Sequence, residues 1–181
     1  NYNLAYAYFK LKDYASAIKY FGDYTLSQKE DKIRLMDAYL RLGDCNFMAA
    51  KYWPAMDAYN KAIDLKSIDA DYAAFQKALS YGFVGKTDKK IDDFNSFLQK
   101  FKTSQYRDDA LFELGNTYVT ENKTDLAIKT YDQLLSEFKN GSFASKAILR
   151  QGLIYYNGQK DESAIAKFKE VAAKYPKTPE A

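Results

Sequence analysis

The fold of this chain is decided by residues 111–131, where the sequence reads LFELGNTYVTENKTDLAIKTY. Apolar residues recur every three or four positions on both sides of the polar segment 121–124, which is the period of an α-helix. The stretch therefore predicts two short amphipathic helices joined by a tight turn. Gly115 in the first helix and Tyr131 in the second lie sixteen residues apart, and a small residue and a large ring recur at this spacing along the chain.

Two series of residues carry this spacing through the whole sequence. The ring that ends each repeat falls in turn on Phe21, Tyr59, Phe94, Tyr131 and Phe168. The small residue sixteen positions before each ring falls on Ala5, Gly43, Ala78, Gly115 and Gly152. Two antiparallel helices approach to about 8–10 Å only where small side chains face large ones. The two series therefore predict five helical hairpins, which must stack on one another to bury their apolar faces.

The pattern predicts an all-α chain without strands. A single array is expected, with repeats at approximately 1–30, 31–68, 69–104, 105–141 and 142–181. Helices are expected near 1–11, 14–27, 31–49, 52–65, 69–84, 87–101, 105–121, 124–138, 142–157 and 161–174. Thr124 and Asp161 are expected to cap the second helices of their hairpins. Phe94 and Tyr131 are expected to be buried between helices.

The repeat resembles the tetratricopeptide repeat, whose unit runs large-x2-Leu-Gly/Ala-x2-Tyr-x8-Ala-x3-Phe/Tyr. The best match runs from Leu111 through Gly115, Tyr118 and Ala127 to Tyr131. The resemblance covers nearly the whole chain and implies a right-handed α-α superhelix, a solenoid of about five hairpins. It also implies a protein that binds or assembles other proteins.

Two repeats depart from this pattern, and one segment refines the resemblance. Asn46 stands at the Tyr position of the second repeat, and Lys90 at the small-residue position of the third. The Lys90 stem is expected to extend over apolar surface. The tail 175–178, Tyr-Pro-Lys-Thr, is similar to the linkers of tetratricopeptide proteins from bacterial cell envelopes. This similarity implies a location in the bacterial periplasm or cell envelope, with the cytoplasm as the alternative. Because the sequence opens within a helical pattern, a fragment of a longer chain is expected.

The residue types argue against an enzyme. The chain has no His and a single Cys, Cys45, so a Cys/His nucleophile or a thiolate zinc site cannot be assembled. The segment 82–87 resembles a phosphate-binding loop, but Ser80 stands where that motif needs Gly. Its context also predicts helix–turn–helix instead of strand–loop–helix. No enzymatic activity, cofactor or metal is therefore expected.

Charge limits the class of partner. The net charge is +3, and basic and acidic residues are interspersed along the chain without the basic stripe of a nucleic-acid binder. No run of eighteen apolar residues exists, so no membrane-spanning segment is predicted. A protein or peptide partner is expected, and no nucleic acid.

By resemblance to the family, the first helices of successive repeats line a concave groove that binds a partner segment. The residues expected to face it are Tyr6, Phe9, Arg41, Asp44, Phe47, Tyr72, Gln76, Leu79, Phe83, Asp109, Glu113, Asn116, Arg150, Leu153 and Tyr156. Aromatic rings with scattered charges suit an extended or helical segment. The chain is interpreted as a non-catalytic interaction scaffold. The alternative is an accessory region that recruits a substrate or partner for a larger multidomain enzyme or sensor.

Overall fold

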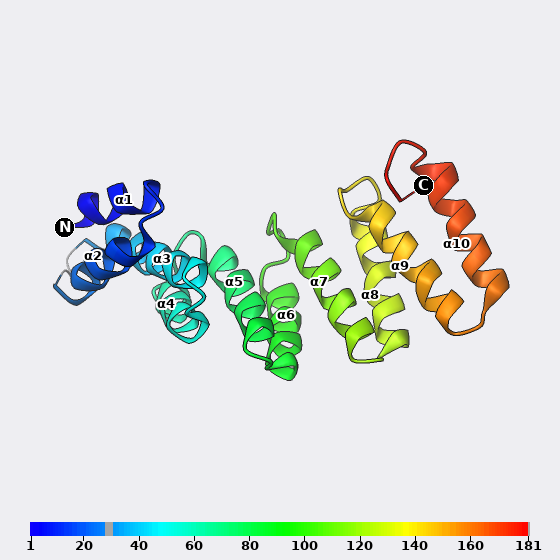
Figure 1. Cartoon of the computed structure of the whole chain (residues 1–181), viewed down its shortest axis with the longest axis horizontal. Coiled ribbons are helices and arrows are strands. Elements are labelled where there is room, and N and C mark those ends of the chain that lie inside the picture. Colours follow the sequence, from blue (N-terminus) through cyan, green and yellow to red (C-terminus); the bar gives the residue numbers. More distant parts are fainter. Residues whose placement is uncertain (28–30, 181) are drawn as a thin grey trace. The chain divides into compact units, whose positions relative to one another are not determined.

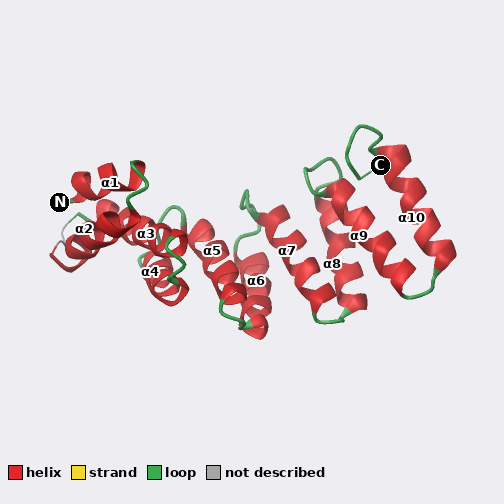
Figure 2. Ribbon diagram, viewed as in Figure 1, coloured by secondary structure: helices red, strands yellow, loops and turns green. Residues whose placement is uncertain are grey.

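The computed structural model describes residues 1–27 and 31–180. Within this part of the chain all regular structure is helical, and there is no strand (Figure 2). The helices pair into hairpins: α1 (Tyr2–Lys10) with α2 (Tyr14–Ser27), α3 (Lys32–Met48) with α4 (Tyr52–Asp64), α5 (Ala70–Phe83) with α6 (Thr87–Lys100), α7 (Arg107–Thr120) with α8 (Thr124–Glu137), and α9 (Ala144–Asn157) with α10 (Asp161–Lys174) (Figure 1). The prediction of an all-α solenoid of about five hairpins is confirmed.

The chain forms two compact units. Unit 1, Asn1–Lys100, holds hairpins 1 to 3, and unit 2, Phe101–Ala181, holds hairpins 4 and 5. In unit 1 each helix packs on the next, and the first helices also touch, α1 with α3 and α3 with α5. In unit 2 the two hairpins pack through α8 and α9. Each unit therefore has its own core.

Glycines allow the two helices of a hairpin to approach closely. A Cβ atom added to Gly43 would stand 2.5 Å from Cε1 of Tyr59, and one added to Gly115 would stand 2.5 Å from Cε1 of Tyr131. Carbon atoms in contact prefer about 3.5–4.0 Å, so any side chain at either glycine would displace the ring. Both rings are fully buried, as is Phe94, which confirms the predicted burial of Phe94 and Tyr131.

One type of turn joins the two helices of every hairpin. In hairpin 4 the N–H of Lys123 donates to the carbonyl of Tyr118 at 2.8 Å, and the N–H of Asn122 to that of Val119 at 3.0 Å. These bonds, with Asn122 at φ 56°, make a Schellman motif. The same pair of bonds recurs around the left-handed residues Lys12, Ala50, Gly85, Asn122 and Gln159. The turn thus fixes how each second helix is placed against the first.

The prediction that Thr124 and Asp161 cap their helices is wrong. Each is the first residue inside its helix, and the N-cap positions belong to Lys123 and Lys160, whose side chains make no cap hydrogen bond. The Schellman turn is the reason, because the residue that closes it is already the N-cap of the next helix. In hairpin 1 this place is held by Asp13, which does accept a backbone N–H.

The two departures from the repeat pattern are accommodated locally. The Cδ atom of Lys90 lies 3.2 Å from the Cβ position of Gly82, and its Nζ lies 5.8 Å from the ring centroid of Phe94. The Lys90 stem therefore covers apolar surface, as expected. Asn46 is buried and donates from Nδ2 to the carbonyl of Leu42 at 2.8 Å, so its amide is satisfied within its own helix.

Candidate partner-binding surface

The predicted groove residues of unit 1 lie on its first helices, α1, α3 and α5, and most of them touch one another. The ring centroids of Tyr6 and Phe9 are 5.9 Å apart. The Arg41 guanidinium lies 5.8 Å from the centroid of Phe9, within the range of a cation–π contact. Farther along, the ring centroids of Phe47 and Phe83 are 5.5 Å apart. We call the surface that these side chains form the inner face of unit 1. Its residues are Tyr6, Phe9, Arg41, Asp44, Phe47, Tyr72, Gln76, Leu79 and Phe83.

Asp44 lies at the centre of the inner face. Its Oδ2 accepts from Nη1 of Arg41 at 2.7 Å, and its Oδ1 accepts from the hydroxyls of Tyr59 and Tyr72, both at 3.0 Å. Burial raises the pKa of Asp44, although Arg41 and the two hydroxyls oppose this. Burial would lower the pKa of Arg41, but the charges of Asp44 and Asp37 raise it. The guanidinium is therefore a fixed cation between two carboxylates.

The predicted residues of unit 1 differ in exposure. Asp44 is 7% exposed and both of its carboxylate oxygens accept hydrogen bonds within the chain, so its role is structural. The Arg41 side chain is 23% exposed and Phe83 is 60% exposed. The remaining predicted residues are half-buried: Tyr6, Phe9, Phe47, Tyr72, Gln76 and Leu79. The surface that a partner could reach therefore consists mainly of ring edges around one arginine.

In unit 2 the predicted residues lie on α7 and α9. Burial raises the pKa of Asp109, and the nearby charges of Asp108 and Glu113 raise it further. Asn116 accepts the hydroxyl of Tyr131 at 2.8 Å through Oδ1. The three predicted residues on α9, Arg150, Leu153 and Tyr156, are all exposed. This unit thus presents carboxylates on one first helix and a cation with apolar side chains on the other.

Asp44 and Asn116 have a structural role that the repeat pattern alone does not reveal. They follow Gly43 and Gly115 directly, and each accepts the hydroxyl of the Tyr fifteen residues later. The three repeats that end on Phe have no such acceptor at this position, which holds Tyr6, Leu79 and Leu153. A buried hydroxyl needs an acceptor. In this sequence, Asp or Asn follows the small residue only in the two repeats that end on Tyr. This correlation was the signal from which the hydrogen bond between the two side chains could have been predicted.

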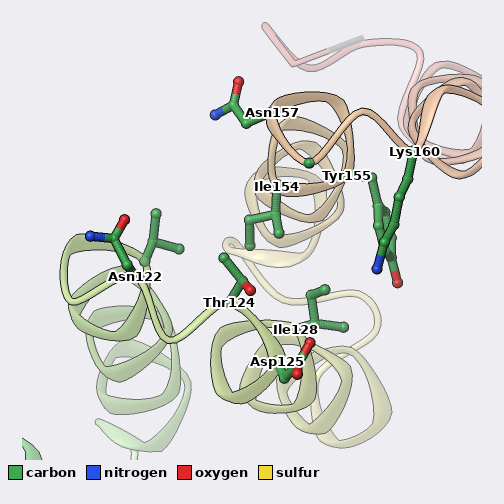
Figure 3. A pocket seen from close by; sticks show the side chains of 10 residues that line it. Asn122, Thr124, Asp125, Ile128, Ile154, Tyr155, Asn157 and Lys160 are labelled. Carbon is green, nitrogen blue, oxygen red and sulfur yellow. The ribbon is translucent and has the colours of Figure 1, made fainter.

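Unit 2 also has a pocket, whose lining side chains are drawn in Figure 3. Side chains from the α7–α8 turn, from α8 and from the end of α9 border it. Ile128 and Ile154 contribute apolar surface, while Asp125 and Lys160 contribute charges of opposite sign. The complete lining is Val119, Asn122, Thr124, Asp125, Ile128, Ile154, Tyr155, Asn157, Gly158 and Lys160, and no predicted groove residue is among them.

Over residues 1–27 and 31–180 no helix has both the length and the apolar character needed to cross a membrane. In the same ranges no three His, Cys, Asp or Glu side chains gather as a metal site would require. The segment 82–87, which resembles a phosphate loop, joins α5 to α6, so a helix precedes it where the motif needs a strand.

Antiparallel hairpins that recur along the chain and pack on one another within each unit define a helical-repeat module of the kind that binds proteins. Family models described as tetratricopeptide repeat match residues 1–29, 109–141 and 146–178, which together exceed half of the chain. The chain belongs to the tetratricopeptide repeat family, whose members are generally non-enzymatic interaction modules. No curated protein sequence matches it significantly.

Solved structures show the same fold. MamA superposes with a TM-score of 0.78 at 19% identity, over 96% of this chain and 95% of that chain. The apo form of RapI gives a TM-score of 0.83 at 15% identity, over 98% of this chain and 53% of RapI. A tetratricopeptide repeat protein from Parabacteroides merdae gives 0.76 at 16% identity, over 96% of this chain and 64% of that chain. At these identities the likeness shows the fold alone.

Proposed function

We propose that this chain is a non-catalytic scaffold that holds a segment of a partner protein on the inner face of unit 1. The observation that carries the proposal is a line of contacts across the first helices. Phe9 on α1 meets Arg41 on α3, and Asp44 on α3 joins Arg41 to Tyr72 on α5. Aromatic rings supply contact area at a low cost in conformational entropy. A layer already held in place by its own contacts loses little freedom when a partner binds.

Arg41 suggests which part of the partner is recognised. Its Nη1 donates to Asp44 and its Nε to Asp37, while Nη2 has no acceptor among the described residues. Asp37 is itself held by the hydroxyl of Tyr2. Because two carboxylates already surround the guanidinium, a neutral acceptor suits Nη2 better than a third carboxylate. A main-chain carbonyl of an extended or helical segment provides one.

A random peptide library displayed on phage tests the proposal when it is selected on the immobilised chain. The dissociation constants of the selected peptides are then compared between the wild type and Arg41→Lys. Lysine keeps the charge but loses the planar fork of donors, so we expect binding about tenfold weaker, or about 1.4 kcal/mol. Arg34→Lys is the matched control, because Arg34 lies on the same helix and pairs with Asp31 instead. Failure to select any peptide, or equal affinity for both proteins, would contradict the proposal.

A further inference from the structure

Two turns of unit 1 present exposed apolar side chains. Met48 and Trp53 flank the α3–α4 turn, Phe83 ends α5 at the next turn, and each is more than half exposed. Residues 45–56 and 72–87 contain no acidic side chain. We define the apolar tip as the exposed residues of the two turns, which are Met48, Ala49, Ala50, Lys51, Trp53, Pro54, Phe83, Gly85 and Lys86.

Ring contacts hold the two turns side by side. The rings of Tyr52 and Phe83 are stacked, with centroids 4.7 Å apart and planes 9° from parallel. Trp53 meets Tyr81 edge to face, with centroids 6.4 Å apart. Each ring pair joins the beginning of α4 to the end of α5. The apolar tip is therefore one surface and not two separate loops.

The corresponding turns of unit 2 are different. Lys123 and Lys160 occupy the same turn positions as Lys51 and Lys86. Acidic side chains lie beside them, Glu121 and Asp125 in hairpin 4 and Asp161 and Glu162 in hairpin 5. Lysine at this position is thus common to four hairpins. Lys51 has no acidic residue within five positions on either side and Lys86 has only Asp88, whereas Lys123 and Lys160 each have two.

We propose that the apolar tip docks on an anionic lipid surface, with Trp53 in the headgroup region and Lys51 and Lys86 against lipid phosphates. Tryptophan favours the boundary between headgroups and hydrocarbon. Lysine stems can lie along apolar surface while their ammonium groups reach the phosphates. Protein interfaces are enriched in Arg and depleted in Lys, so two lysines without an arginine favour lipid over an acidic protein. The next acidic residue along the chain, Asp88, is followed by Lys89, which offsets its charge.

Trp53 is the single tryptophan of the chain, so its fluorescence reports on the tip directly. The full chain is titrated with vesicles of equal parts phosphatidylglycerol and phosphatidylcholine, and separately with phosphatidylcholine alone. We expect a blue shift of the Trp53 emission and co-sedimentation with the anionic vesicles, and neither with the neutral ones. Raising the salt concentration should weaken binding, because it screens exposed charges.

Two matched double variants test whether binding depends on the lysines of the tip or on the net positive charge of the chain. Lys51→Gln/Lys86→Gln should weaken binding to the anionic vesicles about 25-fold, since each lysine near an anionic surface contributes about fivefold. Lys123→Gln/Lys160→Gln changes the same turn positions in unit 2 and should alter binding less than about twofold. Met48→Ser removes apolar surface from the tip without changing charge and should weaken binding severalfold.

Several outcomes would overturn the proposal. They are the absence of binding to anionic vesicles, sedimentation without a shift of Trp53, equal binding to neutral vesicles, and equal weakening by both double variants. A shift of Trp53 caused by polyglutamate but not by vesicles would also overturn it, and would assign the tip to an acidic protein segment instead.

Discussion

Hairpin 2 of unit 1 and hairpin 4 of unit 2 meet the same requirement with different chemistry. Each buries a tyrosine ring against a glycine, and each must give the tyrosine hydroxyl an acceptor. Hairpin 2 uses the carboxylate of Asp44, and hairpin 4 uses the amide of Asn116. A buried carboxylate must be neutralised, whereas a buried amide need not be.

The residue one helical turn before each acceptor differs in charge between the two hairpins. Arg41 stands three positions before Asp44 and binds it, whereas Glu113 stands three positions before Asn116. The acceptor thus decides which charge its neighbour can carry. As a result, unit 1 has a fixed cation at the centre of its inner face, and unit 2 has carboxylates at the equivalent place.

Charge reversal at Arg41 should give the largest effect. Arg41→Glu leaves Asp44 without its cation and adds a carboxylate beside Asp37, so the free energy of unfolding should fall by about 3–5 kcal/mol. Arg150→Glu, at an exposed site on α9, should change it by less than about 0.5 kcal/mol. Urea denaturation of both variants checks this. Similar values for the two would show that the Arg41 cluster is not an energetic centre.

Exchanging the acceptor in hairpin 4 tests whether acceptor and neighbour are coupled. Asn116→Asp puts a carboxylate beside Glu113 and should cost about 1–3 kcal/mol. The double variant Asn116→Asp/Glu113→Arg recreates the arrangement of hairpin 2 and should recover a large part of that loss. A double-mutant cycle with Glu113→Arg alone measures the coupling. Strict additivity would show that the two positions act independently.

The left-handed turn residues allow a smaller comparison. Ala50→Gly relieves an unfavourable conformation at φ 56° and should raise the free energy of unfolding by about 1 kcal/mol. Asn122→Gly should gain only about a few tenths of that, because Asn tolerates this conformation better than Ala does. Thermal unfolding midpoints of the two variants compare the effects. A gain at Asn122 equal to that at Ala50 would mean that backbone strain is not the cause.

The weakest expected difference is in the dependence of stability on acid. The Arg107 hydrogen bonds lower the pKa of Glu137, so its stabilising contribution is lost as the pH falls below its ordinary value of 4.5. The pKa of Asp44 is shifted in the opposite direction, so its effect on stability has the opposite pH dependence. Its raised pKa favours the folded state below its ordinary value of 3.8, and this contribution is lost as the pH rises. Glu137→Gln should therefore make the acid loss of stability shallower by less than about 1 kcal/mol, and Asp44→Asn should make it steeper. Denaturation midpoints measured from neutrality to below pH 3.8 decide the signs.

The repeat spacing was enough to predict the hairpins, and most helix ends lie within two residues of their expected positions. It succeeded because Gly115 and Tyr131 express a packing constraint that every repeat shares. The constraint says nothing about single side chains, and so Asp44 was predicted to face a groove although its side chain is buried. Thr124 was predicted as a cap because its residue type suits that role, while the turn had already assigned the place to Lys123. Features that depend on several repeats at once, such as the apolar tip, need the structure.

The turns and the linkers differ in how freely they could change length during evolution. The helices of each hairpin are separated by three residues, at 11–13, 49–51, 84–86, 121–123 and 158–160, whereas the linkers 65–69, 101–106 and 138–143 are not all of one length. Each residue advances an α-helix by about 100°, so an insertion within a turn would rotate the second helix until its ring no longer met the glycine. An insertion between hairpins moves the glycine and the ring of the next hairpin together, so their contact is kept. Heritable changes of length should therefore accumulate between hairpins, and grafted segments or reporter tags should be tolerated there and rejected at the turns.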